Sequence, residues 1–556
     1  MLHHGQWPHG VDWLCEAVAE CYLPIIRMCR RLEADGIRPG ITLDISPILC
    51  EQLAHRDFPS VFAAYCTNHI KLARSDRDTF IADQADQQLI DQAAYWIQWY
   101  EDVVEQFENS VDQDVLGALR DLQDSGSIEI MTCGATHGYF PLLAEDASIE
   151  RQVALAVFSY ERHFKRKPKG IWLPECAYRP RYPWKTYLPV YAYSRERYRK
   201  GIEQILVANG LEFFVTDEAA LKESRPIGVR THDGYRVPYE ETYGEARKHL
   251  DVRSPYCVYK AGGFEHHECV SVLTRHMNIA MQVWSGSTGY PGDPDYLDFH
   301  KKYHASALRY WRVTDSTADM QYKQPYIPKW AAGRAEQHAR HFVEMLEATA
   351  LARRAQCDGE PTICLPFDTE LFGHWWFEGP YFLEHVLRRI YASQVLTTRT
   401  ASEQIAISSP SCEVQLPESS WGRDGNDSVW MNDETKWTWE AEYALERRIT
   451  LMMEKHPASS WDQQQERIAR NVFGELLLLQ ASDWQFLITN WTARDYAEMR
   501  FHNHASDARK CCDMFERYAV SRTLTDDDHT WLQELEMRDG IFSHELNLYF
   551  ASLRAS

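Results

Sequence analysis

The sequence predicts an α/β fold in which strands and helices alternate as in a barrel, followed by an α-helical domain. Two short apolar runs, 170–173 and 361–367, are each closed by an acid, Glu175 and Asp368, as happens at the mouth of a barrel. Strand and helix patterns alternate as far as about residue 400, and mostly helical patterns follow. The 556 residues are too many for one compact core, which also predicts more than one domain.

About six buried strands are expected before residue 400, fewer than the eight of the common barrel. Each is a short apolar run bounded by turn residues. The expected strands are 41–45, 128–133, 170–173, 213–217, 270–273 and 361–365.

Helical patterns separate these strands. A helix capped by Asp12 should end near Gly36, and a mostly helical insertion is expected at about 51–125, where 80–107 is the clearest helix. Residues 226–268 are rich in Gly, Tyr and charge, which predicts a long loop near the site. Further helices are expected at 148–163, 332–354, 440–455, 461–480, 495–519 and 526–537.

The charge and the cysteines restrict the class of function. A formal net charge of -22 argues against binding to nucleic acid or to an anionic membrane surface, because both require a basic face. The 14 cysteines include no C-x-x-C pair, so we expect reduced thiols. We therefore expect a cytoplasmic protein without a signal peptide or a membrane span, whose oligomeric state the sequence leaves open.

Glu175 and Asp368 form the candidate catalytic pair. Glycosyl transfer with retention of configuration needs one carboxylate as nucleophile and a second as acid and then base, about 5 Å apart. Strand ends on facing sides of a barrel can supply such a pair. The alternative is that each acid only caps the helix after its strand.

Other polar and aromatic residues are candidates for substrate binding. His137 follows the strand 128–133 between glycines that let a ligand approach the backbone, although a lone His is more often structural. Asp483 interrupts an apolar helix and needs a partner or a ligand there. Four tryptophans in loop-like or helix-break surroundings could stack on glucose rings, with packing as the alternative: Trp284, Trp421, Trp430 and Trp484.

No metal ion or other cofactor is expected. His3, His4 and His9, or the run 265–268, could ligate a divalent ion, but neither group has HExxH spacing or a C-x-x-C companion. The chain has no Walker A loop, and no GxGxxG motif follows a strand.

Four longer motifs carry the candidate residues: GATHGY at 134–139, WLPECAY at 172–178, FDTELFGHWW at 367–376 and SDWQFLI at 482–488. Together they resemble motifs of glycoside hydrolase family 57, and within it of the 1,4-α-glucan branching group, over nearly the whole chain. The resemblance implies Glu175 as nucleophile and Asp368 as acid/base. It also implies substrate contacts from His137, Arg275, Trp284, Trp421, Trp430, Asp483 and Trp484.

The fold that the resemblance implies is a (β/α)7-type barrel with a helical insertion and an α-helical C-terminal domain. The expected domains are 1–400, with the insertion at about 51–125, and 401–556, which would contribute to the active-site groove.

The family's first strand, which ends in His-x-His-x-Pro, is missing from the sequence, so we expect a barrel that lacks it. Either the true start lies upstream or the protein is a damaged copy, and the intact later motifs favour the first explanation. A second departure is Arg275-His276, where the family has Arg followed by Asp.

The activity that the resemblance implies is retaining transglycosylation, which cleaves an α-1,4 bond and forms an α-1,6 branch in amylose or glycogen. Three alternatives stay open: an α-amylase-type hydrolase of the same family, a catalytically impaired glucan-binding protein, and a metal-dependent carbohydrate deacetylase on a seven-stranded barrel. The Cys176 context and the tryptophans favour branching. The ratio of branching to hydrolysis and the length of the branches do not follow from the sequence.

Overall fold

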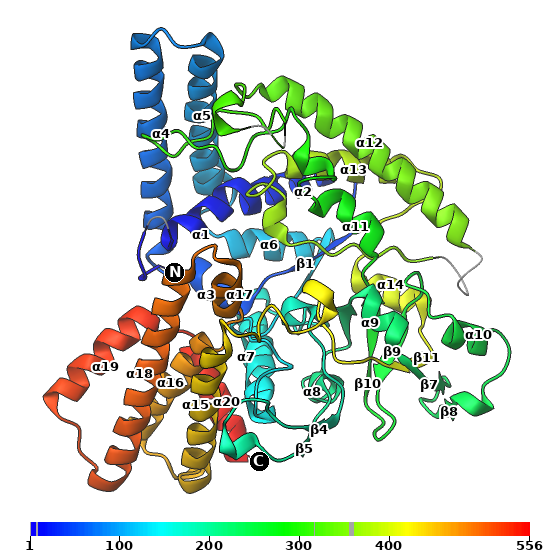
Figure 1. The fold of residues 1–556 in the computed structure, drawn as a ribbon, viewed down its shortest axis with the longest axis vertical. Coiled ribbons are helices and arrows are strands. Elements are labelled where there is room, and N and C mark those ends of the chain that lie inside the picture. Colours follow the sequence, from blue (N-terminus) through cyan, green and yellow to red (C-terminus); the bar gives the residue numbers. More distant parts are fainter. Residues whose placement is uncertain (1, 7–8, 316, 318, 355–360, 556) are drawn as a thin grey trace. The chain divides into compact units, whose positions relative to one another are not determined.

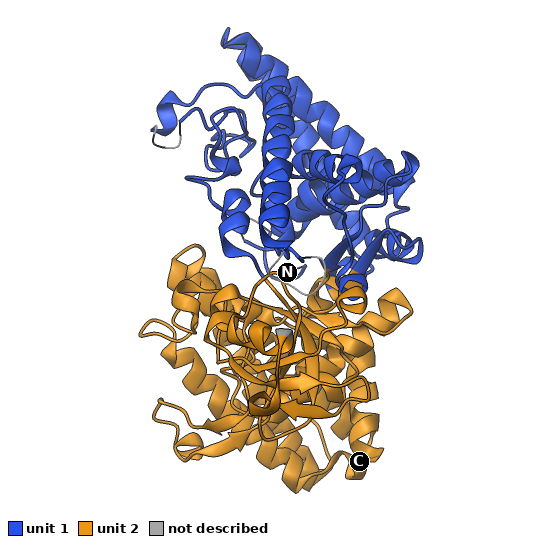
Figure 2. Ribbon diagram, turned by 90° about the vertical axis from the view of Figure 1, so that its right-hand side faces the viewer, with its two compact units in different colours: residues 1–43, 52–129, 275–404 blue, residues 44–51, 130–274, 405–556 orange. Residues whose placement is uncertain are grey.

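The structure is a computed structural model that describes residues 2–6, 9–315, 317, 319–354 and 361–555. The chain forms two compact units, each assembled from several segments (Figure 2). Unit 1 comprises residues 1–43, 52–129 and 275–404, and unit 2 comprises residues 44–51, 130–274 and 405–556. Among the helices of the described residues, none is both long enough and apolar enough to cross a membrane.

Unit 2 contains a seven-stranded mixed sheet in the order β3-β6-β10-β9-β11-β7-β8. Figure 1 labels its strands β7 to β11. Its parallel part is β3 (Gly170–Ile171), β6 (Phe213–Thr216) and β10 (Cys269–Thr274). All four residues of β6 are buried, as expected for a strand covered on both faces. The bridge from Thr132 to Ile171 continues the parallel pairing on the other side of β3.

The rest of this sheet occupies the region where the sequence predicts a long loop, so that prediction is wrong. Three strands are β7 (Arg225–Arg230), β8 (Arg236–Pro238) and β9 (Tyr259–Gly262), and a short helix, α10 (Glu245–Asp251), lies between β8 and β9. A further strand, β11 (Cys412–Gln415), comes from the region where only helices were expected, and it pairs with both β7 and β9.

An ion-pair cluster explains why these short polar strands hold together. Glu413 of β11 has no exposed side-chain surface, and its carboxylate accepts hydrogen bonds from Arg230 Nε at 2.8 Å and from Arg236 Nη2 at 2.6 Å. The two arginines belong to β7 and β8. A buried carboxylate is stable only when it is paired in this way, so the cluster joins three strands that have little apolar surface of their own.

Five of the six expected strands are present among the described residues. The first two are β1 (Ile41–Asp44) and β2 (Ile128–Met131), which form a two-stranded sheet, and β3, β6 and β10 are the next three. The sixth is reduced to a parallel bridge between Arg275 and Cys364. The strands of the described residues do not close into a complete barrel.

Helices make up most of unit 1. The first predicted helix is interrupted by a π-helical turn, Val18–Tyr22, and its N-cap is Gly10 and not Asp12. The helix predicted at 80–107 is in fact two helices: α4 ends at Ala82, and α5 begins at Gln87 after Asp86 accepts a cap hydrogen bond from the Gln88 N–H. The helices of unit 1 are α1 (Val11–Ala17), α2 (Leu23–Ala34), α4 (Phe58–Ala82), α5 (Gln87–Glu105), α6 (Val115–Asp124), α11 (Met277–Trp284), α12 (Pro328–Arg353) and α13 (Gly379–Ala392).

The C-terminal helices of unit 2 pack around the apolar face of α16 (Gln463–Leu479). The other helices of unit 2 are α7 (Asp146–Phe164), α8 (Ile202–Ala208), α9 (Glu218–Glu223), α15 (Lys436–Lys455), α17 (Asp483–Asn490), α18 (Arg494–Ser521), α19 (Asp526–Asp539) and α20 (Ser543–Ala555). Two short helices, α3 (Pro47–Leu53) and α14 (Ala401–Ser408), and the hairpin of β4 (Tyr182–Trp184) and β5 (Arg197–Arg199) complete the fold.

The cysteines follow the expectation in part. Of the 13 cysteines that the described residues include, twelve are free thiols, and Cys357 lies outside the described residues. Cys257 is disulfide-bonded, so the prediction that all cysteines are reduced is wrong for this residue.

Candidate active site

Glu175 stands at the carboxyl end of β3, in a backbone conformation that is unusual for a residue with a side chain. Pro174 ends the strand pairing and begins a 3₁₀ turn, Pro174–Cys176. Within the turn Glu175 has φ 59° and Cys176 has φ 52°, both in the left-handed region. Each such residue costs on the order of 1–2 kcal/mol, so the surrounding contacts must hold the turn in place.

Trp421 supplies two of those contacts. Its backbone N–H donates to the carbonyl oxygen of Glu175 at 3.1 Å, which ties the strained turn to the 421–425 loop. Its indole Nε1–H donates to Glu175 Oε2 at 2.9 Å. The indole ring lies edge-on against Trp172, with ring centroids 4.7 Å apart, and this packing fixes the direction of the N–H.

The other carboxylate oxygen of Glu175 accepts a hydrogen bond from Ser482, a fully buried residue. Ser482 Oγ donates to Glu175 Oε1 at 3.4 Å and lies 2.8 Å from His137 Nδ1. Because a hydroxyl has one proton, the donation to Glu175 requires that Ser482 accept from a protonated His137 Nδ1. The three side chains thus form a hydrogen-bonded chain that is polarised toward the carboxylate.

The backbone places His137 and Ser482 next to each other. His137 has φ 61°, and its carbonyl oxygen accepts from the Ser482 N–H at 3.0 Å. An antiparallel bridge between Gly138 and Ala481 holds the same two segments together. The segment that follows β2 and the one that precedes α17, far apart in sequence, therefore meet beside Glu175.

Burial and hydrogen bonding act on the Glu175 carboxyl group in opposite directions. Burial raises its pKa, and the neighbouring charge of Asp483 raises it further. The charge interaction with His137 and the hydrogen bonds from Trp421 and Ser482 lower it, because they stabilise the anion. Burial is the largest effect, so the pKa lies above its ordinary value, and the donors keep the carboxylate available as an anion.

We expect replacement of Trp421 by Phe to change the pH dependence of activity. The variant keeps an aromatic ring against Trp172 but loses the N–H that stabilises the Glu175 anion, so the pKa of Glu175 rises. The acid limb of the kcat/KM profile should move to higher pH, and activity near pH 7 should fall about tenfold, the loss of one hydrogen bond to a charged group. A profile from pH 4 to 9 checks this, with Trp491→Phe, at an exposed tryptophan, as the matched control. An unshifted acid limb would contradict it.

The packing alternative accounts for two of the four tryptophans. Trp430 is 1% exposed and stacks on Tyr139 with ring centroids 4.5 Å apart. Trp484 is 8% exposed, and its Nε1–H donates to the carbonyl oxygen of Leu478 at 2.8 Å. This burial favours the packing alternative for Trp430 and Trp484.

We expect Trp430→Ala to act on stability. Removal of a buried indole should lower the free energy of unfolding by about 3–5 kcal/mol through lost contacts and an unfilled cavity. Trp491→Ala removes an indole that is 69% exposed, so it should change the free energy of unfolding by no more than about 0.5 kcal/mol. Urea unfolding followed by circular dichroism measures both variants. Unchanged stability with weaker glucan binding would instead support a role in the groove.

Asp368 lies in unit 1, exposed, at the start of a 3₁₀ turn, Thr369–Leu371. Its side chain makes no hydrogen bond to the amides of this turn, so the capping alternative does not describe it. The π-helical turn of unit 1 supports the segment, since Cys21 Sγ donates to the carbonyl oxygen of Thr369 at 3.0 Å.

Two more candidates lie in unit 1. Arg275 follows β10, is 5% exposed and forms the parallel bridge with Cys364, so its strand end and that of Asp368 are neighbours. His276 caps α11, since its Nδ1 accepts from the Ile279 N–H at 3.3 Å, which is a task that Asp also performs. Trp284 ends α11 and is half-buried.

The structure thus brings His137, Glu175, Trp421 and the charge of Asp483 together in unit 2, and places Arg275, Trp284 and Asp368 in unit 1. Sequence reasoning missed the parts that Ser482 and Trp172 play at Glu175. Ser482 begins the SDWQFLI motif, which was the available signal, whereas nothing in the local pattern singles out Trp172.

Comparison with known proteins adds independent information. The family model "Glycosyl hydrolase family 57" matches residues 3–417, and the model "1,4-alpha-glucan branching enzyme, C-terminal" matches residues 442–549. The chain is 36% identical to a 1,4-α-glucan branching enzyme of Thermococcus kodakarensis, over 97% of this chain and 75% of that one.

Solved structures agree with these matches. The GH57-type branching enzyme from Pyrococcus horikoshii superposes with a TM-score of 0.85 at 34% identity, covering 98% of this chain and 94% of that one. The α-amylase AmyC from Thermotoga maritima has a TM-score of 0.77 at 27% identity, covering 98% and 96%. The predicted α/β barrel class with a helical C-terminal region is confirmed by these likenesses.

Proposed function

Because this chain belongs to glycosyl hydrolase family 57, we propose that it is a 1,4-α-glucan branching enzyme that works by retaining transglycosylation. One observation carries the proposal. Residues 442–549 match the branching-enzyme C-terminal model, and this region contains Ser482. The Ser482 hydroxyl donates a hydrogen bond to the carboxylate of Glu175, the candidate nucleophile. The part of the chain typical of branching enzymes therefore supplies a side chain to the reacting group.

The reaction divides between the two carboxyl groups. In the first step a Glu175 oxygen bonds to the anomeric carbon of an α-1,4-linked glucose, and Asp368 gives its proton to the departing glucan oxygen. In the second step Asp368 takes the proton of a 6-hydroxyl on an acceptor chain. That oxygen then displaces Glu175 from the anomeric carbon and leaves an α-1,6 branch. Two inversions give net retention.

The donors around Glu175 suit both steps. Trp421 and Ser482 stabilise the Glu175 carboxylate before it attacks the anomeric carbon and again after it leaves that carbon. Their hydrogen bonds also orient its two oxygens. His137 is hydrogen-bonded to Ser482. We propose that it also contacts a sugar hydroxyl of the glucan. Arg275 and Trp284 of unit 1 are proposed as further contacts with the glucan, and the exposed Asp483 is proposed as a contact beside Glu175.

The proposed substrate is a neutral α-1,4-glucan such as amylose or glycogen, which agrees with the acidic chain. We also propose a barrel domain at 1–400, with a helical insertion at about 51–125, and a helical domain at 401–556 that contributes to the groove. A cytoplasmic location completes the proposal.

Incubation with amylose tests the proposal. Branching predicts that α-1,6 linkages, counted by proton NMR, accumulate while reducing ends stay nearly constant. The likeness to the Thermotoga maritima α-amylase favours hydrolysis as the second candidate, in which water replaces the 6-hydroxyl. Formation of reducing sugars without new α-1,6 linkages would show that the protein is a hydrolase. Formation of neither product would indicate a glucan-binding protein without activity.

A further inference from the structure

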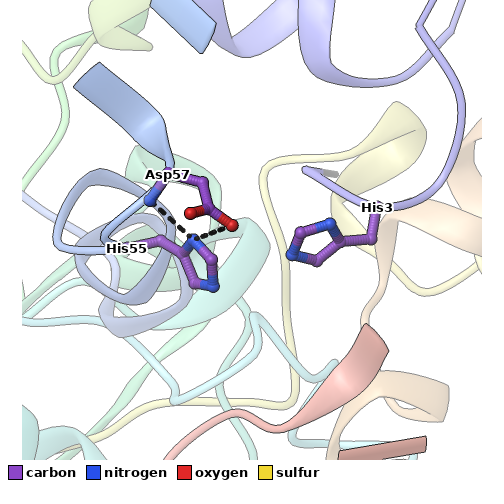
Figure 3. A group of neighbouring side chains, drawn as sticks. All are labelled: His3, His55 and Asp57. Atoms are coloured by element: carbon purple, nitrogen blue, oxygen red, sulfur yellow. Dashed lines mark hydrogen bonds and ion pairs between the residues drawn. The ribbon is translucent and has the colours of Figure 1, made fainter. Parts of the chain in front are cut away.

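Three side chains from two separate segments of unit 1 are neighbours in the fold: His3, His55 and Asp57 (Figure 3). One ring nitrogen of each histidine and one oxygen of the carboxylate all lie within 4.8 Å of one another. The two imidazole rings are 5.2 Å apart and meet edge to face, at 73°. His3 precedes α1, whereas His55 and Asp57 lie in the turn between α3 and α4, so the fold creates the cluster.

The carboxylate of Asp57 is directed to this cluster and not to the helix that follows. Asp57 is the N-cap of α4, where an Asp side chain ordinarily accepts from the first amides, but here it makes no such bond. Its Oδ2 lies 3.8 Å from His55 Nδ1. Its Oδ1 lies 3.5 Å from Nε of Arg56, a side chain that is 89% exposed. One carboxylate oxygen thus faces the histidines.

The structure assigns to His3, His55 and Asp57 a binding site for a first-row transition-metal ion such as Zn²⁺. Two imidazoles and one carboxylate are a ligand set that such ions prefer, whereas Mg²⁺ and Ca²⁺ prefer oxygen ligands alone. His3 is exposed and the other two side chains are half-buried, so an ion can enter and keep water in its remaining positions.

The geometry requires only a small rearrangement. Zinc bonds of about 2.0–2.2 Å in a tetrahedron place the ligand atoms roughly 3.3–3.5 Å apart. The separation of 3.8 Å between His55 Nδ1 and Asp57 Oδ2 is close to this already, and a contraction of about 1 Å, within reach of the exposed His3 side chain, completes the set.

The existing hydrogen bond at His55 opposes binding only weakly. His55 Nδ1 accepts from the Asp57 N–H at 3.2 Å, which is at the long end of the range for such bonds. An ion that takes Nδ1 replaces this bond, and the accessible turn lets water reach the released N–H. The bound ion would tie the segment before α1 to the start of α4.

Calorimetric titration of untagged, chelator-treated full-length protein with ZnCl₂ tests the site. The expected result is one equivalent of binding that weakens more than about tenfold in each of three variants: His3→Gln, His55→Gln and Asp57→Asn. Asn is also a good N-cap, so the last variant preserves the start of α4. His232→Gln, at an exposed histidine elsewhere, is the matched control and should bind like the parent.

A second measurement needs no variant. Zn²⁺ should protect His3 and His55 from modification by diethyl pyrocarbonate, read by mass spectrometry, while His232 stays reactive. Equal Zn²⁺ affinity in the parent and all three variants would assign the ion to another group, such as Glu16, Glu20 and His374, and overturn the proposal. Absence of binding by the parent, or unprotected histidines, would overturn it as well.

Discussion

Replacement of Glu175 by Gln should abolish glucan transfer. The amide keeps the size of the side chain and can still accept from the Trp421 N–H, but it cannot form the glycosyl ester on which a retaining mechanism depends. The expected loss in kcat is at least about 10⁴-fold, the order found when a covalent mechanism loses its nucleophile. The rate of α-1,6 linkage formation from amylose is the measurement.

The control for this variant is Glu196→Gln, at an exposed carboxylate of the same unit. It makes the same chemical change away from the site and should retain the parent rate. Matching circular dichroism spectra would show that Glu175→Gln is folded. Transfer by the Glu175→Gln variant at the parent rate would remove Glu175 from the role of nucleophile.

Replacement of Asp368 by Asn should have the second largest effect, and its signature should differ. Loss of the general acid and base is expected to slow branching of amylose by about 10²–10⁴-fold. A donor with a fluoride leaving group, such as an α-maltooligosyl fluoride, needs no protonation, so it should still load Glu175. The glycosyl-enzyme would then accumulate, because the 6-hydroxyl lacks a base.

Mass spectrometry of the quenched Asp368→Asn reaction should detect the added sugar on the peptide that contains Glu175. Azide, a nucleophile that needs no base, should release it and restore turnover. Asp78→Asn, at an exposed aspartate on α4 in the same unit, serves as the control. Equal rates with glucan and with the fluoride, both at the parent level, would exclude Asp368 as the acid/base.

The parallel strands could be predicted because their signal is local. A buried strand such as β6 is a short apolar run whose residues all face the interior, and this pattern is readable in one segment. The antiparallel strands β7, β8 and β11 were missed for the opposite reason. They are short and polar, and the pairing of Glu413 with Arg230 and Arg236 stabilises them across about 180 positions of sequence.

Two tryptophans show that local sequence does not predict the contacts of a single side chain either. Trp421 and Trp430 lie nine positions apart in similar sequence surroundings, and both were expected to line a groove. The fold turns one indole N–H to Glu175 and buries the other ring against Tyr139. Local composition cannot distinguish these outcomes, since the partner that decides each comes from a distant segment.

The local order of residues was enough to single out Glu175 and Asp368 as candidates, because apolar runs that end in Pro and an acid define strand ends without reference to any other segment. His137 could be singled out as well, because the family motif that contains it is also a local sequence pattern. The link from His137 through Ser482 to Glu175, and the approach of His55 and Asp57 to His3, depend on packing. Hydropathy patterns specify which face of an element is buried. Which side chains meet across that face is decided by the folded backbone, which fixes distances between residues that the sequence keeps far apart.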